Sequence, residues 1–458
     1  MSIAAISAAC LSEFRPKDAI NGYCSPFSVE AGQVLEFFIS SRVEYQIYIC
    51  RLTDIAEGAA RVAPEFELTN LPKSLPRFQR TSLRAWQDGC QWQSTDKFQV
   101  PTSYHSGLYA AECRGTDGST WHVTFAVRPS AIANQEPILV LANSNTWNAY
   151  NDWGRVSRYT RDREISAVNF ERPNPYASSN YEAASDAHLT RAELWLLRWL
   201  QSRSYQFDVC ADSDFHSGTF DLNKYRAIIL STHPEYWTRE MVARLRQYLS
   251  VGGNLLYLGG NGIFEAVTFS SRMQSLVFHD GDVGTNITRE HYYFRNLDGQ
   301  VCEREILGVA FLYDNYEQAP GPYRVLEPGH WLFNGTGCVA NSLVGAGGYR
   351  GGACGREMDT SSGVPGQPGP TTPLVDAWSL HTDGSPGSDR GAAPRNLVVL
   401  AEGIKGTATS PHTGQMTYSE TQSGGFVFAV GSYCFTGTLL SDAVLQKIVG
   451  NALARSLQ

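Results

Sequence analysis

The stretch that decides the fold is "AIILSTHPEYWTREMVARLRQYL", residues 227–249. It begins with a short apolar run typical of a buried strand and continues, from Thr238 onward, with apolar residues at helical spacing. A strand that leads directly into a helix needs little more than a capping residue in the turn. This turn instead carries His233 and Glu235, and their i, i+2 spacing points both side chains the same way if the backbone stays extended. The turn is therefore a candidate functional site.

A purely structural explanation of this turn also exists. Pro234 would end the strand, Thr238 would cap the helix, and the acidic side chain of Glu235 would favour the helix N-terminus. Tyr236 and Trp237 would then only pack. The turn lies, however, at the carboxyl end of a predicted strand, where ligands commonly bind in α/β sheets. This position favours the functional interpretation.

The segments around this stretch alternate between strand and helix. The run "PILVLANS" (137–144) predicts a strand, and "AHLTRAELWLLRWLQSR" (187–203) predicts a helix with Thr190 as its candidate N-cap. The runs "YQFDVC" (205–210) and "GGNLLYLGGNG" (252–262) predict further strands. This order predicts a parallel sheet with helices on both of its faces.

The first 131 residues follow a different pattern. Short β segments such as "QVLEFFISS" (33–41) and "TWHVTFAVRP" (120–129) are separated by turns, without long helical patterns, which predicts a β-sandwich. We therefore expect two domains, a β-sandwich over residues 1–131 and an α/β domain over residues 132–458. A Gly/Pro-rich insertion at about 342–395 is too long for a simple connection and is interpreted as a mobile flap.

The composition limits the classes of function. The chain has 458 residues, a formal net charge of −8 and a pI near 5.7. No run of Lys or Arg is long enough to neutralise several phosphates, which excludes nucleic acid as the main partner. No apolar run approaches the roughly 20 residues that span a bilayer, so no membrane partner is expected. The 10 cysteines include no Cys-x-x-Cys pair, which favours free thiols and a cytoplasmic location.

Three further segments carry candidate chemistry. The segment "NSNTWNAYNDWG" (143–154) is predicted as an irregular loop that offers amides and aromatics, although tryptophan packing alone explains it equally well. In "SYHSGLYAAEC" (103–113), a core position explains Tyr109 without any function. The segment "GGNGIFEAV" (259–267) ends a strand and offers Asn261, but glycine-rich strand ends are common. No zinc-protease, Walker, nucleophile-elbow or EF-hand motif is present.

Several of these motifs together resemble one known family. "ILVLANSNTWNAYNDWG" (138–154), the segment 227–262 and "GREMD" (355–359) are similar, in this order, to the large (beta) subunit of the iron-dependent N,N-dimethylformamidases. The resemblance runs from about Gly22 to near the C-terminus. It implies a β-sandwich followed by a glutamine-amidotransferase-like α/β domain. Such a domain is flavodoxin-like, with a mostly parallel sheet and helices on both faces.

The same resemblance implies a site built around one iron ion. Matched motif by motif, the implied metal ligands are Tyr109, Tyr150 and Glu235. The implied catalytic residues are His233, which would transfer protons, and Asn261 and Glu357. Phenolate and carboxylate are hard oxygen donors that suit ferric iron. The ion would act as a Lewis acid towards water and an amide carbonyl.

The implied activity is hydrolysis of the C–N bond of a small amide or formamide, with iron as the cofactor. Two alternatives stay open: an iron enzyme that uses the same site for a lyase, rearrangement or redox reaction, and a metal-free binding or scaffold protein of the same fold. The family's large subunit is longer and has a small partner subunit. A homo-oligomer and a complex with a small subunit both stay open for this chain.

Overall fold

The computed structural model describes most of the chain. The described residues are 18–55, 61–131, 135–160, 165–178, 188–278, 294, 302–311, 319–361, 393–404 and 413–458. Within them the strands form five sheets. Most of the predicted flap, residues 362–392, lies outside the described residues.

Two sheets near the N-terminus share one core. The first has the strand order β1 (Ile20–Ser25), β3 (Val34–Ser41) and β6 (Asp96–Gln99). The second has the order β2 (Ser28–Glu30), β8 (Thr120–Arg128), β7 (Gly107–Gly115), β4 (Tyr45–Arg51) and β5 (Glu67–Asn70). Every second residue of β3, namely Leu35, Phe37 and Ile39, is 0% exposed and faces this core. The two-residue period of a half-buried strand accounts for this alternation.

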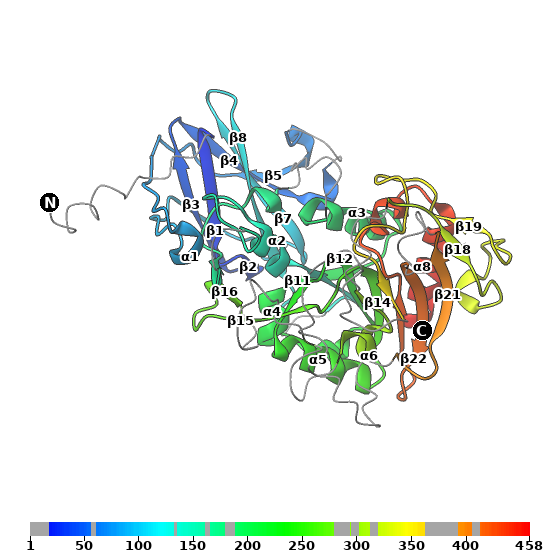
Figure 1. Ribbon diagram of the computed structural model, residues 1–458. Coiled ribbons are helices and arrows are strands. Elements are labelled where there is room, and N and C mark those ends of the chain that lie inside the picture. The colour runs from blue at the N-terminus through cyan, green and yellow to red at the C-terminus, as the bar shows by residue number, and fades with distance from the viewer. Residues whose placement is uncertain are drawn as a thin grey trace.

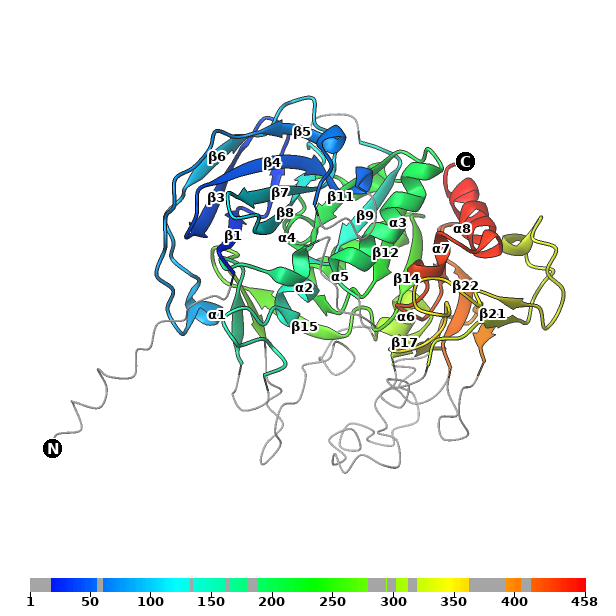
Figure 2. The ribbon, with the colours of Figure 1, turned by 90° about the horizontal axis from the view of Figure 1, so that it is seen from above.

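A nine-stranded sheet forms the centre of the molecule (Figures 1 and 2). Its order is β11 (Phe207–Ala211), β9 (Ile138–Ala142), β12 (Ala227–Thr232), β14 (Asn254–Gly259), β23 (Phe426–Ala429), β22 (Gln415–Glu420), β21 (Val398–Gly403), β18 (Tyr323–Val325) and β19 (Leu343–Val344). The pairs from β11 to β23 are parallel. The pairs from β23 to β19 are antiparallel. In both views the N-terminal sheets lie on one side of the parallel strands and the antiparallel strands lie on the other.

The predicted fold class is therefore wrong. A glutamine-amidotransferase-like, flavodoxin-like domain would have a mostly parallel sheet, whereas this chain is mostly strand in several mixed and antiparallel sheets. The error arises at the C-terminal end of the sheet. Only residues 421–425 separate β22 from β23, and a parallel pair needs a crossover of a dozen residues or more. Apolar strand runs in this region therefore pair as a hairpin rather than through helical crossovers.

Helices cover both faces of the nine-stranded sheet. The helices are α1 (Ala85–Asp88), α2 (Ser144–Tyr150), α3 (Thr190–Ser202), α4 (Asp212–Ser217), α5 (Arg239–Ser250), α6 (Glu303–Leu307), α7 (Thr436–Leu439) and α8 (Ala443–Ser456). Apolar residues of α3 and α8 share a core with one face, and those of α4, α5 and α6 share a core with the other. Thr238 caps α5 by accepting a hydrogen bond from the amide of Met241. Thr190 is the first residue of α3, and Leu189 rather than Thr190 occupies the N-cap.

Two smaller sheets complete the described structure. One has the order β10 (Ala167–Asn169), β16 (Ser275–Phe278), β15 (Glu265–Phe269) and β13 (Tyr236–Trp237), and the other pairs β17 (Ala310–Phe311) with β20 (Asp359–Thr360). Short 3₁₀ turns cover Leu52–Asp54, Pro64–Phe66, Pro175–Ala177, Leu222–Lys224 and Trp331–Phe333. Because β13 begins at Tyr236, the His-Pro-Glu turn leads directly from the nine-stranded sheet into a strand of a second sheet.

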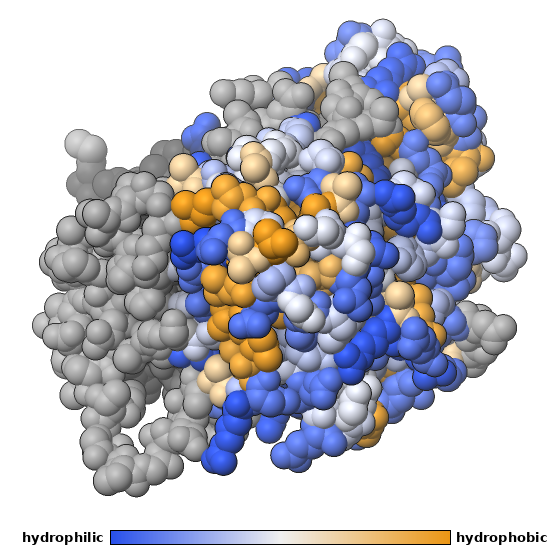
Figure 3. Space-filling view, turned by 90° about the vertical axis from the view of Figure 1, so that its right-hand side faces the viewer, coloured by the Kyte–Doolittle hydropathy of each residue, from blue (hydrophilic) through white to orange (hydrophobic). Residues whose placement is uncertain are grey.

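One face of the molecule exposes apolar side chains among hydrophilic ones (Figure 3). It is the side that carries β18, β19 and β21. Leu343, in the short edge strand β19, is 56% exposed, and Val339, which precedes this strand, is 67% exposed. None of the helices within the described residues could cross a membrane. The nine cysteines of the described part of the chain are free thiols.

Candidate active site

The carboxyl ends of three parallel strands bring the candidate residues together. β9 leads into α2, β12 leads into the His233 turn, and β14 leads into the segment of Asn261. In these strands Leu141 is paired with Leu230, and Thr232 is paired with Gly259, so the three ends lie at the same edge of the sheet. This edge is where parallel sheets bind ligands.

The segment 143–154, predicted as an irregular loop, folds instead as α2 over Ser144–Tyr150. The helix can form because buried carboxylates accept its N-terminal donors. The amide of Asn145 donates to Asp212 Oδ2 at 2.7 Å, and Glu193 Oε1 accepts from Asn143 Nδ2 at 2.9 Å and from Trp147 Nε1 at 2.7 Å. Burial raises the pKa of both Asp212 and Glu193 to about 8. These contacts fix the helix that carries Tyr150.

The backbone around the site is strained. Thr232, Asn261 and Arg356 have φ angles of 62°, 52° and 54°, in the left-handed region that non-glycine residues seldom adopt. A β-carbon at Gly260 would collide with the carbonyl of Glu357 and the backbone nitrogen of Tyr433. The backbone at Gly260 therefore lies so close to the backbones of Glu357 and Tyr433 that no side chain would fit between them. Such strain is concentrated at functional sites.

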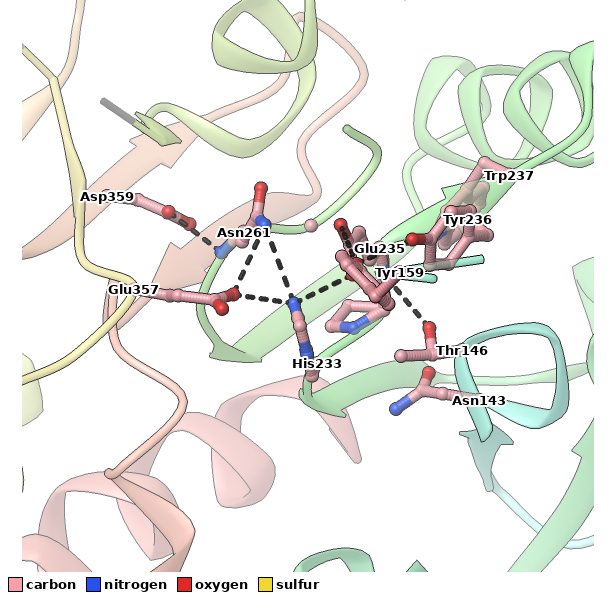
Figure 4. A network of polar contacts seen from close by, with 12 residues as sticks. Asn143, Thr146, Tyr159, His233, Glu235, Tyr236, Trp237, Asn261, Glu357 and Asp359 are labelled. Carbon is pink, nitrogen blue, oxygen red and sulfur yellow. Dashed lines mark hydrogen bonds and ion pairs between the residues drawn. The ribbon is translucent and has the colours of Figure 1, made fainter. Parts of the chain in front are cut away.

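His233 lies between two carboxylates (Figure 4). Its Nε2 is 2.7 Å from Glu357 Oε2 and 3.3 Å from Glu235 Oε2. The imidazole is 0% exposed, and its Nδ1 has no hydrogen-bond partner among the described residues. Burial lowers the pKa of His233, but the charges of Glu357 and Glu235 outweigh burial and raise it to about 9. Burial likewise raises the pKa of Glu357, but the charge and hydrogen bond of His233 outweigh it and hold that pKa below 4.5.

Asn261 is held in place by an acidic and a phenolic group. Its backbone amide donates to Asp359 Oδ1 at 2.8 Å. The hydroxyl of Tyr257 donates to the other oxygen of the same carboxylate, Asp359 Oδ2, at 2.6 Å. The side-chain nitrogen of Asn261 donates to Glu357 Oε2 at 3.2 Å and lies 3.5 Å from His233 Nε2. The amide of Asn261 is therefore oriented towards the pair formed by His233 and Glu357, as Figure 4 shows.

Three tyrosines surround Glu235. The hydroxyl of Tyr159 donates to Glu235, with its oxygen 3.1 Å from Oε1 and 3.2 Å from Oε2, and lies 2.6 Å from the hydroxyl of Tyr236. The rings of Tyr150 and Tyr159 are 4.4 Å apart. Burial and the charge of Glu235 raise the pKa of both phenols well above 10. Tyr159 is 38% exposed as a residue, and its hydroxyl faces Glu235.

Further aromatic rings enclose His233. The ring of Tyr150 is 5.8 Å from that of His233, and the rings of His188 and Tyr433 are 5.2 Å and 5.8 Å from it. Tyr433 also lies under the guanidinium of Arg350, at 4.8 Å. The site therefore combines buried acid–base groups with largely aromatic walls.

The structure brings together five of the six residues proposed from the sequence. Tyr150, His233, Glu235, Asn261 and Glu357 lie in one cluster. Tyr109 does not join it: the hydroxyl donates to the carbonyl of His105 at 2.8 Å, and the ring stacks with Tyr104 and Phe125 inside the core of the N-terminal sheets. A ligand set of Tyr109, Tyr150 and Glu235 is therefore not assembled.

The residue that sequence analysis missed is Tyr159. It lies nine positions after Tyr150, beyond the end of α2, and the only available signal was a second tyrosine after the same strand end. No group of three or more His, Cys, Asp and Glu side chains in the described ranges has a metal-binding arrangement.

Comparison with known proteins agrees with the sequence motifs. Residues 56–447 match the model of the C-terminal region of the N,N-dimethylformamidase beta subunit-like family. The chain is 24% identical over 407 residues to an N,N-dimethylformamidase beta subunit of Alcaligenes sp, and 23% identical over 418 residues to that of Paracoccus aminophilus. Each match covers 77% of this chain and 52% of the relative, so the chain spans about half the length of these relatives. The chain belongs to the N,N-dimethylformamidase beta subunit-like family.

Proposed function

We propose that the chain hydrolyses the C–N bond of a small amide or formamide, yielding a carboxylic acid and an amine, with one iron ion as cofactor. Its relatives are named as N,N-dimethylformamidase subunits, which supports this reaction class. The observation that carries the proposal is the cluster of Tyr150, Tyr159 and Glu235 directly beside His233. It combines three oxygen donors with a buried proton-transfer group.

The donor set fits a cation of high charge. The Tyr159 hydroxyl lies against both oxygens of Glu235, and the ring of Tyr150 packs on that of Tyr159. Both phenols have pKa values raised well above 10 by burial and by Glu235, so they need a compensating positive charge to ionise. Phenolate and carboxylate oxygens suit ferric iron better than softer metals. Iron held by Tyr150, Tyr159 and Glu235 would supply Lewis acidity towards water and the amide carbonyl.

His233 is the residue placed to move a proton. Its Nε2 is held by Glu357 at 2.7 Å, while Nδ1 is buried and has no partner among the described residues. Because the pKa of His233 is raised to about 9, the imidazole carries a proton on both nitrogens near neutral pH, and Nδ1 is therefore the atom from which a proton can be delivered to the leaving amine. Glu357 and Asn261 keep the imidazole in this orientation, because both contact the Nε2 side of the ring.

The name of the relatives also bears on assembly. Both are beta subunits, and we propose that this chain likewise acts as part of an assembly of subunits. Val339 and Leu343 are 67% and 56% exposed, and the face shown in Figure 3 carries apolar side chains among hydrophilic ones.

The test is hydrolysis of N,N-dimethylformamide by the full chain supplied with iron, followed by the appearance of dimethylamine and formate in proton NMR spectra. We expect product with the unmodified chain and a loss of roughly 10²-fold or more with Glu235→Gln. Glu112→Gln is the matched control, because Glu112 is also fully buried and paired with a cation, Arg114, but lies in the N-terminal sheets. Equal activity of Glu235→Gln and the unmodified chain would contradict the proposed site.

A further inference from the structure

A cavity lies between the N-terminal sheets and the helices α2 and α4. Its volume is about 400 Å³, within the range of roughly 300–1,000 Å³ typical of small-molecule sites, which often occur where domains meet. β1, β8, α2 and α4 all contribute to its wall. The wall does not include His233, Glu235, Asn261 or Glu357, so the cavity is separate from the proposed active site.

The wall contains an ion pair that is held slightly apart. Arg128 Nη1 donates to the carbonyl of Ser28 at 3.1 Å, and Nη2 donates to Glu30 at 3.4 Å. Asp214 Oδ2 accepts from Ser28 Oγ at 2.6 Å and from the amide of Ala211 at 2.9 Å. Each side chain is thus fixed by its own partners, and Arg128 Nε remains 3.8 Å from Asp214 Oδ1. That separation is too long for a direct hydrogen bond.

One buried donor and one carboxylate oxygen are therefore left without a hydrogen bond. Arg128 Nε has no hydrogen-bond partner, and Asp214, which is 5% exposed, uses only Oδ2 in hydrogen bonds within the described structure. A buried donor without a partner, such as Arg128 Nε, costs free energy. A ligand that offers an acceptor and a donor side by side would satisfy both groups at once.

A carboxamide has this arrangement. Its carbonyl oxygen can accept from Arg128 Nε while its N–H donates to Asp214 Oδ1. A carboxylate would be repelled by Asp214, and an ammonium group would be repelled by Arg128, so the site favours a neutral ligand. Phe27, Trp147 and Phe170 also line the cavity and provide apolar surface for a substituent. We propose that this cavity is a second binding site, for a neutral primary carboxamide with an apolar substituent.

The site lies against the helix that carries Tyr150. Trp147 and Asn148 of α2 line the cavity, while Thr146 of the same helix accepts a hydrogen bond from the amide of Glu235 at 3.3 Å. A carboxamide in the cavity would therefore contact the opposite side of the helix from the active-site cluster. The proposal does not depend on the metal, because neither Arg128 nor Asp214 belongs to that cluster.

The methionines allow a direct test. The chain has 5 methionines, of which Met273 lines the cavity and Met358 follows Glu357 in the sequence. Benzamide is titrated into the full chain labelled with ¹³C at the methionine methyl groups. We expect the Met273 resonance to shift with a saturable curve. A Met273 resonance that does not move up to about 10 mM benzamide, about tenfold above a weak dissociation constant of 1 mM, overturns the proposal.

Two comparisons test the recognition of the amide. N,N-dimethylbenzamide keeps the carbonyl but has no N–H. We expect its affinity for the cavity, measured at the Met273 resonance, to be lower than that of benzamide by about tenfold or more. Arg128→Leu should weaken benzamide binding by a similar factor, whereas Arg114→Leu, which removes a cation of comparable burial from the same sheet, should not. Equal binding of both amides to the unmodified chain overturns the proposal even if Arg128→Leu fails to fold.

Discussion

Replacing Tyr159 by phenylalanine, with Tyr109→Phe as the matched control, separates the site assembled by the structure from the one proposed by motif matching. Each change deletes one oxygen. Tyr109 loses a hydrogen bond of 2.8 Å to the carbonyl of His105. Tyr159 loses its contacts with Glu235 at 3.1 Å and 3.2 Å, but its residue is 38% exposed, so water replaces part of that loss. We expect each change to lower the free energy of unfolding by about 1 kcal/mol.

The two variants should differ in metal binding. Loss of a residue that only supports a ligand typically costs about 10- to 100-fold in metal affinity, and loss of one of three proposed ligands should cost at least as much. Tyr159→Phe should therefore lose iron, visible absorption and amide hydrolysis together, while Tyr109→Phe keeps all three. The assays are elemental analysis, absorption spectroscopy and NMR detection of the released amine. If Tyr109→Phe loses iron and Tyr159→Phe retains it, the cluster described here is not the metal site.

Three other changes have expected outcomes. Glu357→Gln removes the carboxylate 2.7 Å from His233 Nε2, and steady-state kinetics should show a loss of about 10²-fold in turnover at constant iron content. Burial raises the pKa of Glu193 from 4.5 to about 8, so the folded chain holds this proton more tightly than the unfolded chain. The free energy of unfolding should then fall with rising pH across that interval, by up to about 1.4 kcal/mol per pH unit, and Glu193→Gln should flatten the slope in urea unfolding. Arg172 is 1% exposed and donates to five backbone carbonyls, and Arg172→Met should lower the free energy of unfolding by about 3 kcal/mol or more.

Each of these outcomes has a clear opposite. Iron loss in proportion to lost turnover would make Glu357 a metal ligand. An unchanged pH dependence in Glu193→Gln would show that this buried proton does not affect stability. Arg172→Lys keeps the charge but has fewer donors, so stability equal to that of the unmodified chain would show that charge, and not the five hydrogen bonds, stabilises this segment.

The sequence analysis selected residues that the structure brings together, although it assigned the wrong fold class. The proximity of His233, Glu235 and Asn261 could be predicted because each follows an apolar strand run, and parallel strand ends meet at one edge of a sheet. The mostly parallel, flavodoxin-like sheet was a wrong prediction, because β21, β22 and β23 are also apolar runs and only the short connection over residues 421–425 reveals their antiparallel pairing. Apolar composition alone does not specify the direction of a strand.

The tyrosines show the limit of motif matching. Tyr109 lies within a β-rich segment, where a core position was already sufficient to explain it, and the structure places it in that core. Tyr159 reaches Glu235 only because the chain turns back after α2, a path fixed by long-range contacts. Arg172, for example, donates to the carbonyls of Trp153 and Val156. Contacts of this kind have no local sequence pattern, so the contact of Tyr159 with Glu235 could not be predicted from the sequence.

The measurement that tests the central claim most directly is the metal content of the full chain purified without added metal. With Tyr150, Tyr159 and Glu235 as donors, we predict iron at about one ion per chain, together with the visible absorption of tyrosinate bound to ferric iron. Tyr150→Phe should remove both signals while the chain stays folded. Purified chain that contains zinc instead, or iron that is unaffected by Tyr150→Phe, would contradict the proposal that this cluster is the metal site of an amide hydrolase.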